Sequence, residues 1–202
     1  WGDPQLSYEI KIVRPKHRAS GRGVKSSGDK FYVTPNLYEA LQYLRYPTEP
    51  RYLWIDAICI EQENPKEKSQ QVCMMAEIYS RAKEVIVWLG PPTSTFDTAV
   101  EFLESLRPLD LVRLDRVIHG AQFLSKWCAL AKIMEHQYFR RLWILQEVGF
   151  ARRAMVLSGN SRVDWQVFAD GFILFGDRFD DIRQVSYQSR DPDTAQIIAA
   201  SR

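Results

Sequence analysis

The sequence predicts an α/β fold, a sandwich in which helices flank a mainly parallel central sheet. Two runs, "YLWIDAICI" at 52–60 and "EVIVWLG" at 84–90, are apolar on both alternating faces, as strands covered on both sides by helices are. The segment between them has apolar residues at helical spacing, namely Val72, Met75, Ala76, Tyr79 and Ala82. A strand, a helix and a strand in this order form a βαβ unit, whose strands are parallel and whose crossover is right-handed.

The chain before this unit predicts a hairpin and a helix. Residues 7–13 alternate between apolar and polar, and "KFYVT" at 30–34 reads as a second strand, so the two form a hairpin. The connection at 15–30 is basic and rich in Gly and Ser, which is typical of a loop. Thr34 can cap a helix that has Pro35 at its first position and ends near Arg45.

The chain after this unit predicts further helices and one more strand. The periodicity indicates helices at 96–106, at 127–134, at 139–151 and after a capping Asp164, with a strand at 153–159. Residues 108–120 give no clear pattern. The end, 186–202, is polar, and we expect it to be loosely held.

Composition excludes several classes of protein. The 202 residues are 46% hydrophobic, which suits a globular chain, and the net charge of +2 is too small to indicate binding to nucleic acid or an anionic membrane. Its Cys residues are three in number and form no CxxC pair, so neither a zinc site nor a disulfide framework is expected. Free thiols favour a reducing, cytoplasmic compartment. No apolar run reaches the roughly 18 residues of a membrane span, and no signal peptide opens the chain.

Asp56 is the unusual residue of the first apolar run. A buried carboxylate is costly unless it is paired or hydrogen-bonded. Asp56 comes late in the predicted strand, and in parallel sheets the ligand crevice lies beyond the carboxyl ends of the strands. Asp56 therefore either lies at a ligand edge of the sheet or only caps a neighbouring turn or helix, and the sequence leaves both readings open.

Five stretches of the chain form an ordered set. They are "WGDP" at 1–4, "NLYEALQYLR" at 36–45, "YLWIDAICIEQ" at 52–62, "EKSQQVCMMAEIYSRAKEVIVWLG" at 67–90 and "FRRLWILQEVGFA" at 139–151. Together and in this order they resemble the fungal heterokaryon incompatibility (HET) domain. The resemblance implies a HET domain at 1–157, followed at 158–202 by a C-terminal helical extension and a polar tail. The family usually begins with a strand of the type "ALSYxWG", of which only Trp1 and Gly2 remain, so the first strand is expected to be missing from this chain.

The HET domain in turn looks like a distant relative of the TIR domain, a flavodoxin-like sandwich that in many proteins cleaves NAD. The TIR pattern has a strand that ends in Asp, a helix, an apolar strand, and a helix of the form "SxWCLxEL". "RLWILQEV" matches that last helix and places Glu147 at the position of the catalytic glutamate. The resemblance thus implies self/non-self recognition, programmed cell death of the innate-immunity kind, and NAD glycohydrolase activity with NAD as a substrate and no cofactor.

The residues around Glu147 suit this chemistry. Trp143 and Glu147 are four apart and share a helix face, whereas Leu145, Val148 and Ala151 are expected to point to the core. Cleavage of the nicotinamide–ribose bond passes through an oxocarbenium-like state, which a carboxylate beside the ribose stabilises. Other expected contacts are Trp143 or Trp1 stacked on a ring, Arg140 or Arg141 at the pyrophosphate, and Trp1, Gly2, Asp3 and Asp56 around the pocket.

Each role has an alternative. A Glu flanked by Arg residues is often a solvated ion pair, which contributes little energy, and Trp143 fits a core position as well as a pocket. The whole domain also fits a non-enzymatic TIR-like signalling adaptor that acts through protein–protein interaction, or an inactive remnant. For an active domain, the expected partner is a second copy of itself or another death-signalling protein.

Overall fold

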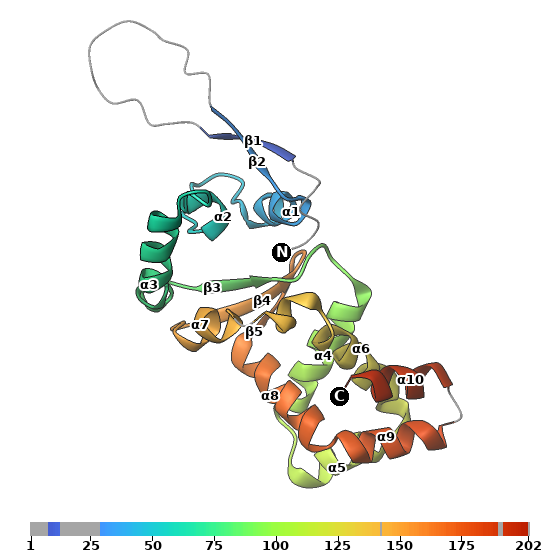
Figure 1. Cartoon of the computed structure of the whole chain (residues 1–202). Coiled ribbons are helices and arrows are strands. Elements are labelled where there is room, and N and C mark those ends of the chain that lie inside the picture. The colour runs from blue at the N-terminus through green and yellow to red at the C-terminus, as the bar shows by residue number, and fades with distance from the viewer. Residues whose placement is uncertain (1–7, 13–28, 142, 190–191, 202) are drawn as a thin grey trace, which may run out of the picture. The chain divides into compact units, whose positions relative to one another are not determined.

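The computed structural model describes residues 8–12, 29–141, 143–189 and 192–201, and it divides into two compact units, 1–68 and 69–202 (Figure 1). Each unit is described by itself. The elements of the first unit are β1 (Tyr8–Ile12), β2 (Asp29–Val33), α1 (Pro35–Leu44) and α2 (Asp56–Cys59), and α3 (Pro65–Arg81) crosses into the second.

The hairpin and the first helix are confirmed. β1 and β2 pair antiparallel, with Tyr8 opposite Val33. The Thr34 hydroxyl accepts a hydrogen bond from the Leu37 amide at 3.3 Å, and Pro35 is the first helical residue of α1. Most of the loop expected at 15–30 lies outside the described residues.

The strand predicted at 52–60 is wrong, and with it the βαβ unit. Residues 51–55 form no regular element, α2 is a single turn that begins at Asp56, and Tyr52 is 96% exposed. The amides of Ile58 and Cys59 donate to the Ile55 carbonyl, so local helical bonds satisfy this backbone. An apolar run fits a strand or a short helix equally well, and within the described residues no neighbouring strand pairs with this one.

The sheet of the second unit has three strands and mixed pairing. β3 (Val85–Trp88) lies parallel to β4 (Ala154–Ser158), and β4 pairs antiparallel with β5 (Ser161–Asp164). The α/β class is confirmed, but the mainly parallel sheet is wrong. A tight turn at Gly159, with φ of +58°, returns the chain directly from β4 into β5. This hairpin spans the domain boundary predicted at 157/158.

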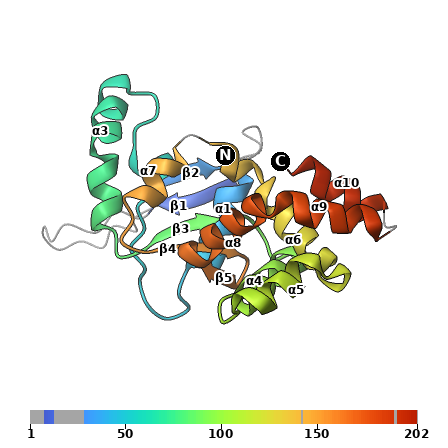
Figure 2. The same cartoon turned by 90° about the horizontal axis from the view of Figure 1, so that it is seen from below.

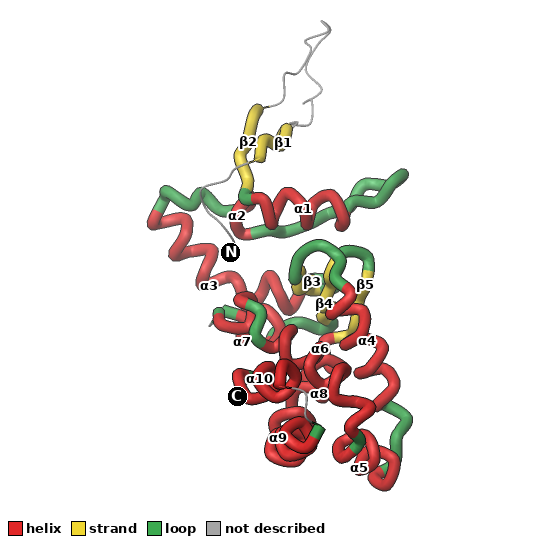
Figure 3. The backbone as a smooth tube through the Cα atoms, turned by 90° about the vertical axis from the view of Figure 1, so that its right-hand side faces the viewer, coloured by secondary structure: helices red, strands yellow, loops and turns green. Residues whose placement is uncertain are grey.

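Helices make up most of the second unit (Figure 3). The helices predicted at 96–106, at 127–134 and after Asp164 are confirmed, and residues 108–120 also contain a helix. The described helices are α4 (Ser94–Leu106), α5 (Leu111–His119), α6 (Leu124–Met134), α7 (Ile144–Gly149), α8 (Trp165–Asp177), α9 (Phe179–Gln188) and α10 (Pro192–Ala200), with short 3₁₀ helices η1 (Ala121–Phe123) and η2 (Gln137–Arg140).

The core of this unit is centred on Trp127 of α6. Trp127 is fully buried, and its ring centroid lies 4.7 Å from that of Phe102 on α4 in an edge-on contact. The Phe175 ring of α8 lies 6.0 Å away, and the indole N–H donates to the Val117 carbonyl at 3.3 Å. These contacts hold α4, α6 and α8 together on one side of the sheet (Figure 1).

The expectation of a loosely held C-terminal end is wrong. Residues 186–188 complete α9, and α10 contacts both α6 and α9. Ile198 of α10 is fully buried, which anchors this helix in the core.

Candidate functional site

The helix predicted at 139–151 is broken into η2 and α7. Trp143 precedes α7, and the Glu147 amide donates to the Trp143 carbonyl at 3.1 Å, so Glu147 follows Trp143 by one helical turn as predicted. The predicted core face is wrong at Leu145, which is 76% exposed, because the break turns Ile144 inward instead.

Glu147 is held by two side chains, Tyr138 and Arg141, and we call these three residues the Glu147 cluster. The Tyr138 hydroxyl donates to Glu147 Oε2 at 2.7 Å. Arg141 Nη2 lies 3.6 Å from Glu147 Oε1, and the Glu147 side chain is 13% exposed. The solvated ion pair is therefore the wrong picture of Glu147, whose carboxylate is largely buried and partnered.

Tyr138 is a residue that the sequence reasoning missed. Its contact with Glu147 depends on the break, because residues nine apart in one continuous helix lie on opposite faces, about 13 Å apart along the axis. Tyr138 is 3% exposed. Burial, followed by the charge and the hydrogen bond of Glu147, raises the pKa of Tyr138 well above its usual value, so the phenol remains a donor at neutral pH.

His136 fixes the start of η2. Its Nδ1 accepts a hydrogen bond from the Tyr138 amide at 3.2 Å. Burial lowers the pKa of His136, although a hydrogen bond with the backbone of Leu89 opposes that shift. The neutral imidazole thus connects the end of β3 to the backbone of Tyr138.

The other predicted residues of this segment are accessible. Trp143 is 46% exposed, which excludes the core reading, and Arg140 is exposed. Phe150, three residues after Glu147 and also missed, is 48% exposed. The structure therefore brings Glu147 and Arg141 together and places accessible aromatic rings before and after Glu147 in α7 and its flanks.

Asp56 lies in the first unit and is exposed. Its Oδ1 accepts a hydrogen bond from the Ala57 amide at 2.7 Å, and its carbonyl accepts one from the Gln62 side chain at 2.9 Å. Asp56 thus begins a short helix instead of ending a strand, but the N-cap of that helix is Ile55 and it makes no side-chain cap bond. Trp1, Gly2 and Asp3 lie outside the described residues.

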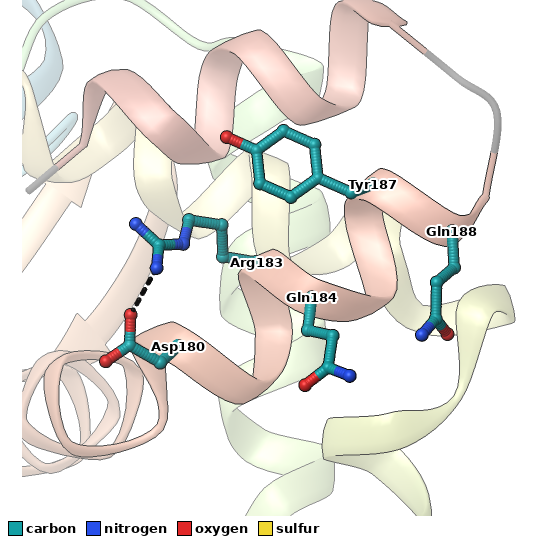
Figure 4. Close-up of a pocket in the computed structure, with 5 residues that line it drawn as sticks. All are labelled: Asp180, Arg183, Gln184, Tyr187 and Gln188. Atoms are coloured by element: carbon teal, nitrogen blue, oxygen red, sulfur yellow. Dashed lines mark ion pairs between the residues drawn. The ribbon is translucent and has the colours of Figure 1, made fainter.

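A hollow of 390 Å³ lies along one face of α9, where Arg183 pairs with Asp180 at 2.8 Å (Figure 4). Figures 1 and 2 place α9 and α7 at opposite ends of the second unit, and no predicted site residue lines the hollow. Its lining residues are Asp180, Arg183, Gln184, Tyr187 and Gln188.

The described part of the chain contains neither a metal-ligand cluster nor a membrane-spanning helix. No group of three or more His, Cys, Asp or Glu side chains there has the arrangement of a metal site. None of the helices described is both long enough and apolar enough to cross a bilayer.

Comparison with known proteins gives one family and one curated relative. The model of the family "Heterokaryon incompatibility protein (HET)" matches residues 1–147, a region that ends at Glu147 and contains the whole Glu147 cluster. "Heterokaryon incompatibility protein 6, OR allele" of Neurospora crassa is 28% identical over 181 aligned residues, which cover 73% of this chain and 26% of that protein. The chain thus spans about a quarter of the relative's length. No solved structure matches.

Proposed function

The chain belongs to the heterokaryon incompatibility (HET) family, and we propose that it acts in self/non-self recognition and triggers cell death after fungal cells fuse. The observation that carries the proposal is the family match over residues 1–147. The Neurospora crassa relative, whose name is that of an incompatibility protein, supports it further.

The chemistry that we propose is hydrolysis of NAD, with Glu147 as the catalytic residue. Water adds to the ribose carbon as its bond to the nicotinamide nitrogen breaks. The electron pair of that bond stays with the nitrogen, nicotinamide leaves as a neutral molecule, and one proton of the water is released to solvent. The Glu147 carboxylate stabilises the positive charge that develops on the ribose. In support, Glu147 is a partnered carboxylate of low exposure, and Trp143, one turn before it, offers an accessible ring for stacking.

The remaining binding roles follow from the same proposal. Arg141, beside Glu147, or the exposed Arg140 would meet the pyrophosphate through the guanidinium fork. The pocket roles of Trp1, Gly2, Asp3 and Asp56 remain predictions. The exposed free thiols of Cys59 and Cys73 support a reducing, cytoplasmic setting.

The TIR-like relationship and activation by self-association belong to this proposal as well. In support, α3, β3 and the α7 segment with Glu147 follow one another in the order of the TIR pattern, although residues 52–60 do not form the strand ending in Asp with which that pattern begins.

A second function, a non-enzymatic adaptor, is favoured by one observation. Trp143, Leu145 and Phe150 expose 46%, 76% and 48% of their surface around α7. Exposed aromatic and aliphatic side chains that gather on one element are typical of protein-binding surfaces.

Expression in a fungal host separates the two functions. For the enzyme, Glu147→Gln abolishes killing and preserves the cellular NAD pool, whereas Leu145→Asp and the exposed control Glu101→Gln behave as the unmodified protein. For the adaptor, Leu145→Asp abolishes killing and Glu147→Gln has no effect. Killing by Glu147→Gln without loss of NAD would contradict the hydrolase.

A further inference from the structure

We propose that Tyr138 is the positioning residue of this site, which fixes the Glu147 carboxylate through Oε2 and leaves Oε1 as the oxygen that meets a ligand. This inference rests on the proposed hydrolysis of NAD, because it assigns Tyr138 a part in the same reaction. The observation behind it is that the two side chains that hold Glu147 differ. Tyr138 is close to the carboxylate and buried, whereas Arg141 is more distant and more accessible.

Tyr138 is the immobile member of the Glu147 cluster. Its side chain is 3% exposed, and its backbone amide is bonded to His136. The next residue, Phe139, packs against α8, with ring centroids 5.5 Å from Phe168 and 5.4 Å from Phe172. Because these contacts fix the Tyr138 hydroxyl, the hydroxyl keeps the Glu147 carboxylate in one orientation, as preorganised sites require.

Arg141 is the exchangeable member. Its Nη2 is 3.6 Å from Oε1, beyond the usual hydrogen-bond distance, and its side chain is 28% exposed. An anionic group of a ligand, such as a phosphate, can therefore take over the Arg141 guanidinium while Tyr138 keeps its hold on Glu147. The Oε1 atom is then free to accept a hydroxyl of the ribose.

The two variants Tyr138→Phe and Arg141→Lys should therefore change different kinetic constants. Tyr138→Phe removes one hydroxyl and frees the carboxylate to turn, so kcat for nicotinamide release falls roughly tenfold with KM little changed. Arg141→Lys keeps the charge but loses the fork, so KM rises with a smaller change in kcat.

The test is a double-mutant cycle of Tyr138→Phe and Glu147→Gln measured on the free energy of unfolding, together with kcat and KM of Tyr138→Phe. Since Tyr138 acts through Glu147, Tyr138→Phe should lower kcat, and its cost in unfolding free energy should be smaller in Glu147→Gln than in the unmodified protein. Tyr187→Phe, a 62% exposed tyrosine on α9, is the matched control and should leave kcat unchanged.

A readout independent of activity accompanies the cycle. The Tyr138 hydroxyl proton, buried and bonded to a carboxylate, should give a downfield proton resonance that is lost in Tyr138→Phe and shifted in Glu147→Gln. No such resonance, zero coupling in the unfolding cycle, or an unchanged kcat in an otherwise active Tyr138→Phe would each overturn the inference. Retained coupling with no nicotinamide release would contradict the proposed hydrolysis alone and leave the hold of Tyr138 on Glu147 supported.

Discussion

At the scale of single residues, Glu147 has two side-chain donors and an accessible aromatic residue one helical turn before it. Tyr138 and Arg141 supply a neutral and a charged donor to its two oxygens, and Trp143 exposes 46% of its surface one turn earlier. A carboxylate that has partners and is still partly exposed can accept a ligand without being left unpaired in its absence. This balance is what the proposed chemistry needs.

His136 should make the stability depend on pH. Burial lowers the pKa of folded His136 below its ordinary value of 6.5, so below that pH the unfolded chain binds the extra proton more readily than the folded one. The stabilising contribution is complete above pH 6.5 and is lost as the pH falls through the lowered pKa. Denaturant unfolding between pH 7.5 and 5 should show this loss.

His136→Asn is the variant that isolates the effect, because Asn keeps an acceptor for the Tyr138 amide and does not titrate. Stability should fall less steeply with pH in His136→Asn than in the unmodified protein. Equal slopes in the protein and in His136→Asn would contradict this account of the imidazole.

Asp56→Ala tests the local role of that carboxylate. The exposed Asp56 carboxylate accepts a hydrogen bond from the Ala57 amide, whereas the bonds from Ile60 and Gln62 go to the Asp56 backbone carbonyl. Loss of the carboxylate should therefore cost no more than about 1 kcal/mol of unfolding free energy. Asp56→Asn, which keeps the acceptor, should cost less. A loss of several kcal/mol in either variant would indicate a buried partner for Asp56.

At the scale of elements, the break between η2 and α7 creates the candidate site. An unbroken helix that ran from Tyr138 through Glu147 would hold the two side chains on opposite faces, and the observed break lets them meet at 2.7 Å. No Pro or Gly marks the break in "FRRLWILQ", so helical periodicity alone predicts a continuous helix there. Helix starts could be predicted from sequence where a capping residue precedes the helix. Thr34 and Asp164 both accept hydrogen bonds from amides of the helices that they cap.

The packing of α8 against α4 depends on Gly171. A Cβ placed on Gly171 would clash with the Leu103 side chain of α4, so Gly171→Ala should lower the free energy of unfolding by about 1–3 kcal/mol. Gly176, in the same helix, has nothing within 4 Å of such a Cβ, and Gly176→Ala should raise it by about 0.5–1 kcal/mol. Denaturant titration of both variants measures the contrast, and equal effects would contradict the close approach of the two helices.

At the scale of the whole chain, α10 is part of the folded second unit. Ile198 is fully buried, so Ile198→Ala should cost about 2–5 kcal/mol of unfolding free energy. The neighbouring Ile197 is only half-buried, and the same change there should cost less. If Ile198→Ala had no effect on thermal or denaturant unfolding, α10 would not belong to this core.

Long-range pairing is what the sequence could not predict. The apolar character of 52–60 indicates burial, but whether such a run forms a strand depends on a partner elsewhere in the chain. The pairing of β3 with β4 and the docking of α10 through Ile198 are likewise set by contacts between distant segments. For the site, the resemblance led to Glu147 and Arg141, whereas Tyr138 became visible only through the three-dimensional contact.

The most direct test of the central claim, that Glu147 carries NAD hydrolysis in this HET family member, is nicotinamide release from NAD by the purified protein. The account predicts release by the unmodified protein, more steeply than linear in protein concentration if self-association activates it. It also predicts loss of release in Glu147→Gln at an unchanged unfolding midpoint, with Glu101→Gln active. No release by a folded protein that still kills cells, or equal release by Glu147→Gln, would contradict the claim.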